Sequence, residues 1–144
     1  MWPVERNGKG WGLMSELVVL AFEKEQDAYG LRGALRMMKD QHLVELEDAP
    51  IVVHEQDGSV EIDQSYGTIA GRLVARFKDI GVDDGFIKEI GHTIEPGHSA
   101  LFLLAKDQLS DEALEMIETS NATLLRSTMS AERVKEFFGG GETA

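Results

Sequence analysis

One pattern occurs twice in this chain and limits its fold more than any other feature. A wholly apolar run at residues 17–22 leads into a charged loop and an amphipathic stretch, and a second apolar run at 101–105 does the same. A short apolar run without polar alternation is typical of a buried strand, and the spacing that follows is that of a helix. The sequence therefore predicts two strand–helix units with their strands inside one sheet.

Length and composition set further limits. A chain of 144 residues fits one domain, and we expect that domain to span 14–138, between a disordered leader or tag-like tail at 1–13 and a disordered tail at 139–144. The chain has no cysteine, which excludes disulfides and thiolate chemistry and fits a cytoplasmic protein. Its net charge of −12 argues against nucleic acid as a partner.

The first half reads as strand, helix and hairpin. Apolar residues three and four apart predict a helix over about 24–41, in which Gly30 and Gly33 indicate a close approach to the sheet. The segment 43–48 starts the next strand or connects to it. Asp57-Gly58 then predicts the turn of a β-hairpin. From residue 66 the pattern is helical again, with Asp83 and Asp84 capping a second short helix that Gly91 ends.

The second half repeats the order. The turn at 95–97 precedes the most hydrophobic strand, 99–105, which we place at the centre of the sheet. Ser110 caps a helix to about residue 119, a strand follows at 122–129, and a terminal helix begins near Ser130.

These elements indicate an α+β, ferredoxin-like sandwich: two βαβ-type halves with an intervening hairpin and helices, plus a C-terminal helix, around a mixed sheet with helices on one face. Wholly apolar central strands also need a cover on the second face. Two covers are open at this point. One is a second copy in a homodimer or larger oligomer, and the other is the chain's own segments 66–90 and 131–138.

Several segments resemble a bacterial family of predicted membrane proteins of unknown function, domain-of-unknown-function family 1269, over nearly all of 14–138. The resemblance rests on 15–22, the hairpin with Val52-Val53 and Asp57-Gly58, the run 81–91, the run 95–102 and the last strand at 124–130. Relatives usually carry a long Gly/Ala-rich apolar insert between the hairpin and the Gly-x-Asp-Asp segment, which implies membrane association for them. Here about 12 residues, 66–77, stand in its place with two Arg, too few for a span of roughly 20 apolar residues.

A search for chemistry gives one set of candidate ligands. His54, His92 and His98 with Glu95 are the side chains available to hold a divalent metal in a chain without cysteine, although no His-x3-His spacing occurs and solvated histidines explain them better. Asp83 and Asp84 suit helix capping better than acid–base work. We predict no catalytic residue, no cofactor and no enzyme activity.

Two classes of function follow as hypotheses. The first is a non-enzymatic assembly or regulatory module that self-associates through its sheet. The alternative is a small-molecule or metal-binding sensor that uses a cleft lined by His and Glu.

Overall fold

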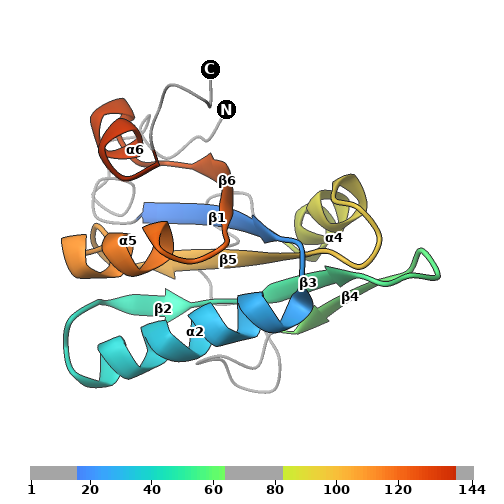
Figure 1. Ribbon diagram of the computed structural model, residues 1–144, viewed down its shortest axis with the longest axis horizontal. Helices are drawn as coiled ribbons and strands as arrows, with labels where there is room; N and C mark the ends of the chain where they lie inside the picture. Colours follow the sequence, from blue (N-terminus) through green and yellow to red (C-terminus); the bar gives the residue numbers. More distant parts are fainter. Residues whose placement is uncertain (1–15, 64–82, 139–144) are drawn as a thin grey trace.

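The computed structural model describes residues 16–63 and 83–138. Along these residues the chain forms one sheet with helices on both of its faces (Figure 1). The α+β class predicted from sequence is confirmed. The elements are β1 (Glu16–Phe22), α2 (Glu25–Asp40), β2 (Leu46–Asp48), β3 (Ile51–His54), β4 (Val60–Asp63), α4 (Asp84–Thr93), β5 (Ser99–Ala105), α5 (Asp111–Glu118), β6 (Thr123–Ser127) and α6 (Ala131–Phe138).

The two apolar runs lie side by side at the centre of the sheet. β1 and β5 pair antiparallel over seven residues each, from Glu16 opposite Ala105 to Phe22 opposite Ser99. All seven residues of β5 are buried, and in β1 only Ala21 is partly exposed. The central position predicted for 99–105 is confirmed, and the lack of polar alternation has its physical reason in burial on both faces.

The sheet is antiparallel in every pairing among the described residues, so the predicted mixed sheet is wrong. Its strand order is β4-β3-β5-β1-β6, with β2 also paired to β5. β3, the strand that follows the first unit, pairs with β5, and β6, which follows the second unit, pairs with β1. Strands that run in the same direction are therefore separated by a strand of the other unit, which leaves only antiparallel neighbours.

Pro50 divides what would otherwise be one long strand. β2 and β3 both pair with β5, Leu46 opposite Ala105 and Ile51 opposite Leu101, so they follow each other along the same edge. Proline has no N–H to donate to a ladder, so regular pairing is interrupted there, although Pro50 O still accepts a hydrogen bond from Phe102 N at 2.9 Å. The segment 43–48, left open as strand or connector, thus contributes a strand of three residues, β2.

The predicted hairpin is confirmed. β3 and β4 pair antiparallel, and Asp57 and Gly58 lie in the loop between them. Gly58 has φ of +93°, a conformation that costs glycine little, and the Asp57 carboxylate accepts hydrogen bonds from the N–H and hydroxyl of Ser59.

α2 and α5 cover one face of the sheet, and their apolar residues form the larger core cluster with Val18, Leu20, Leu101 and Leu103. The terminal helix α6 contributes Phe137 to this same cluster, so segment 131–138, one of the covers left open for the second face, packs on the first face instead. Two glycines of α2 also differ from expectation. A Cβ added to Gly30 or Gly33 meets no atom within 4 Å, so neither marks a close approach to the sheet.

α4 packs on the second face. Ile87 and Ile90 join Leu17, Val19, Val52 and Phe102 in the smaller core cluster, and the Phe86 ring meets the Phe102 ring edge-on at 6.4 Å between centres. The sequence left two covers open for this face, a second copy or the chain's own segments. Where α4 packs, the cover is the chain's own. Gly91 lies inside this helix and does not end it. Its missing Cβ lets α4 approach the side chains of Val52 and Val60.

Some sequence expectations fall outside the described residues: the leader at 1–13, most of the helical stretch from residue 66, and the tail at 139–144. Within the described residues, no helix combines the length and apolar character that crossing a bilayer requires.

Gly91→Ala tests the close packing of α4 on the sheet. An added Cβ would lie 2.7 Å from Val52 Cγ2 and 2.9 Å from Val60 Cγ1. Overpacking costs about 1–3 kcal/mol, which outweighs the gain of up to about 1 kcal/mol in helix propensity. We expect a lower free energy of unfolding in urea titrations. Gly85→Ala in the same helix is the matched control, because its Cβ meets only Asp83 Oδ1 at 3.5 Å, and it should be neutral or stabilising.

Candidate functional site

Two of the candidate metal ligands, His54 and His92, lie together at the end of the sheet where β3 and the last turn of α4 meet. The rings of His54 and His92 have centres 5.7 Å apart and planes at 71°. His54 is buried at 9% exposure, whereas His92 is exposed. The structure thus brings two of the three predicted histidine rings together.

His54 also fastens the connection between α4 and β5. Its Nδ1 lies 2.7 Å from the carbonyl oxygen of Ile94, its backbone N–H donates to His98 O at 3.0 Å, and its carbonyl accepts from Gly97 N at 2.6 Å. Gly97 has φ of +89°, which suits glycine at this turn. His98 therefore meets His54 through its backbone, and the turn is held at three points by one residue.

Three ligands do not converge within the described residues. No group of three or more His, Cys, Asp or Glu side chains there is arranged to hold a metal ion, and Glu95 is an exposed residue of the turn. Asp83 has a structural role, because its carboxylate accepts a hydrogen bond from Phe86 N at 2.9 Å and so caps α4.

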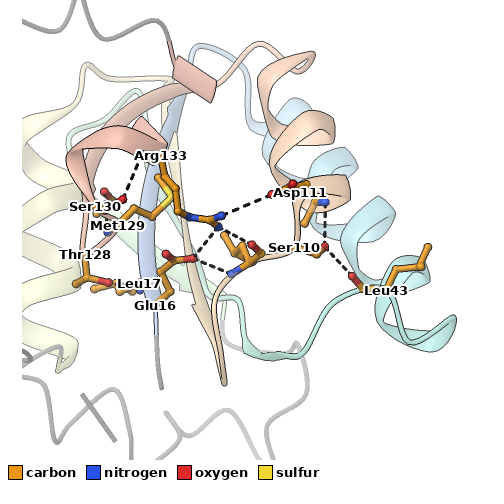
Figure 2. Close-up of polar contacts among 12 residues, drawn as sticks. Glu16, Leu17, Leu43, Ser110, Asp111, Thr128, Met129, Ser130 and Arg133 are labelled. Carbon is orange, nitrogen blue, oxygen red and sulfur yellow. Dashed lines mark hydrogen bonds and ion pairs between the residues drawn. The ribbon is translucent and has the colours of Figure 1, made fainter. Parts of the chain in front are cut away.

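Sequence reasoning missed a buried ion pair at the other end of the sheet, shown in Figure 2. Glu16, 4% exposed at the start of β1, accepts a hydrogen bond from Leu109 N at 2.7 Å and lies 3.5 Å from the Arg133 guanidinium. Arg133, on α6, also donates to Leu109 O and lies 3.6 Å from the Asp111 carboxylate. The pair thus ties α6 and the loop before α5 to the central strand.

Burial governs the acidity of Glu16. Loss of solvent raises the pKa of this carboxyl above its ordinary value of 4.5, while the hydrogen bond from Leu109 and the charge of Arg133 act in the opposite direction without cancelling the effect. The only sequence signal for this group was an acid next to an apolar strand, which does not tell whether the acid is solvated.

A second missed cluster surrounds Arg32. This buried side chain donates to Ala49 O at 3.0 Å, beside the break at Pro50, and to Asp63 at 3.2 Å. The hydroxyl of Tyr29 donates to the same carboxylate at 2.6 Å. Burial and that hydrogen bond raise the pKa of Tyr29. A signal did exist: Arg32 follows Ala28 by four residues on the apolar stripe of its helix, where a charge needs a partner.

The outer side of α2 has a different character. Gln26, Gly30, Gly33 and Met37 follow one another at spacings of four, three and four, so they form one line opposite the buried residues of the helix. Met37 is 62% exposed, the highest value among the exposed large hydrophobic side chains of the described residues. Beside this line a hollow of about 370 Å³ opens between α2 and the end of α5, lined by Gly30, Leu31, Ala34 and Met116 among others.

The raised pKa of Glu16 predicts a specific pH dependence. The folded state favours the protonated carboxyl, so the contribution of this group is fully present below pH 4.5 and is lost as pH rises through the higher folded-state value. We expect the free energy of unfolding of the wild type, minus that of Glu16→Gln, to fall as pH rises from 4.5 through the higher folded-state pKa of Glu16. Urea titrations across this range measure the difference, and a flat or rising difference would show that burial does not dominate at Glu16.

Comparisons with known proteins place the chain in a family. A protein translocase subunit SecA of Methylobacillus flagellatus is 29% identical over 131 residues, which cover 88% of this chain and 14% of that protein. No solved structure matches. The model of the family described as "Protein of unknown function (DUF1269)" matches residues 59–138, from the hairpin to the end of α6. The resemblance seen in the sequence is thereby confirmed, and the chain belongs to this DUF1269 family.

Proposed function

We propose that this chain is a non-enzymatic assembly module that self-associates by antiparallel packing of α2 against α2 of a second copy. The observation that carries the proposal is the exposed line Gly30, Gly33 and Met37 beside the hollow between α2 and α5. The chain's own helices cover one face of the central strands and part of the other, so we place the contact on the helix layer and not on a sheet face.

The two glycines support this surface. Each costs about 1 kcal/mol relative to alanine inside a helix, and neither is needed for packing within the described residues. A residue without a side chain lets another helix approach closely. An antiparallel pair centred near Gly33 sets Met37 of each copy over Gly30 of the other, beside the hollow that Gly30 lines.

Charge supports the antiparallel direction. The first turn of α2 carries Glu25 and Asp27, and its last turn carries Lys39. Opposite ends of the two helix dipoles then lie together, and the acids of one copy lie near the last turn of the other, where Lys39 offsets Asp40. The net charge of −12 on each chain opposes association, so we expect it to strengthen as salt screens that repulsion.

Two further points fit a module. Most of this chain is similar to a segment that makes up 14% of the length of the SecA relative. This supports a domain that works as one part of larger proteins. The ferredoxin-like description belongs to the proposal as well. It is supported by the interleaving of the two strand–helix units, whose second strands each pair with the central strand of the other unit.

Met37→Glu tests the proposal. Burial of a methionine side chain contributes about 1.5–3 kcal/mol, and a two-fold contact buries it twice, so the dissociation constant should rise about 100-fold or more. Sedimentation over a range of concentrations and salt measures it. Leu125→Glu, which charges an equally apolar exposed position on β6, should leave association unchanged. A wild type that stays monomeric throughout, or a larger loss in Leu125→Glu than in Met37→Glu, would overturn the α2 contact.

A further inference from the structure

The imidazoles of His54 and His92, at the end of the sheet, each have Nδ1 beside a backbone carbonyl oxygen. His54 Nδ1 lies 2.7 Å from Ile94 O, and His92 Nδ1 lies 3.0 Å from Lys88 O. A carbonyl oxygen only accepts hydrogen bonds, so in both rings Nδ1 carries the proton. Each neutral ring is left with its lone pair on Nε2.

Both Nε2 atoms remain available. Within the described part of the chain, neither of them makes a hydrogen bond. His54 Nε2 is also absent from the fully buried side-chain atoms without a hydrogen bond there, so it is not sealed from solvent. His92 is exposed. An imidazole whose Nδ1–H donates to a backbone carbonyl has the arrangement that orients metal-binding histidines in proteins.

We propose that His54 and His92 together bind one divalent transition-metal ion of the zinc, nickel and copper class through their Nε2 atoms. Two imidazoles that share an ion at N–metal distances of about 2.0–2.1 Å have ring centres roughly 5–6 Å apart, and the rings here are 5.7 Å apart. Neutral imidazole is a good ligand for these ions, and the acidic chain attracts cations.

The site is open. No third His, Cys, Asp or Glu side chain joins the two rings within the described residues, so water completes the coordination and the ion remains accessible to a ligand from outside. The ion bridges β3 and the last turn of α4 and therefore fastens the helix to the sheet. This inference does not depend on self-association, because the α2 line lies on the opposite helix layer.

Isothermal titration calorimetry of the full chain with zinc chloride and with nickel chloride tests the site. We expect one ion per chain in the wild type and an affinity lowered about tenfold or more in His92→Ala, since even loss of an outer-sphere partner weakens metal binding 10–100-fold. His98→Ala is the matched control and should bind as the wild type does. The His92 side chain is exposed and, within the described residues, makes a hydrogen bond only to Lys88 O, so its removal leaves the fold intact, which circular dichroism checks.

A second measurement is independent of the heat of binding. Zinc should raise the melting temperature of the wild type and of His98→Ala but not that of His92→Ala, because an ion that binds only the folded state stabilises it. Absence of binding up to millimolar metal, equal affinity in His92→Ala, or an equal loss in His98→Ala would each overturn the proposed pair.

Discussion

The antiparallel pairing of β1 with β5 is the interaction on which the rest of the structure depends. Two strands of seven residues lie in full register, and their side chains are buried on both faces of the sheet. A strand that is apolar on both sides gains free energy only if both sides are covered, so these two strands require a layer above and a layer below. α2 and α5 supply one layer, and α4 supplies part of the other.

Charged groups near the margins of this apolar centre fix how the other elements attach. At one end the Glu16–Arg133 pair joins α6, the loop before α5 and the central strand. Beside Pro50, the Arg32 guanidinium donates hydrogen bonds to the carbonyl oxygen of Ala49 and to the carboxylate of Asp63. Buried ion pairs add little net stability, but removing one partner leaves an uncompensated charge. Their consequence is specificity: each element has one position in which these charges are satisfied.

The cover on the second face changes where function is to be sought. Apolar strands by themselves suggested a face open to a second copy, and the position of α4 removes that need over the part that it covers. The features left without a role inside the described residues are then the outward line of α2 and the Nε2 atoms of the paired imidazoles beside α4. They lie on opposite layers of the sheet, so the proposed assembly and the proposed metal binding can be tested separately.

The sequence by itself determined the elements and the central pair of strands. Strand and helix periodicity, the Asp57-Gly58 turn and the caps at Asp83 and Ser110 are local signals, because each is set by residues within a few positions of one another. Only the tertiary structure decided which strands are neighbours, that Gly91 serves close packing, and that Glu16 meets Arg133 and His54 meets His92. These contacts join residues far apart in the chain, and a single sequence carries no local pattern for them. They follow instead from the requirement to bury both faces of two apolar strands at once.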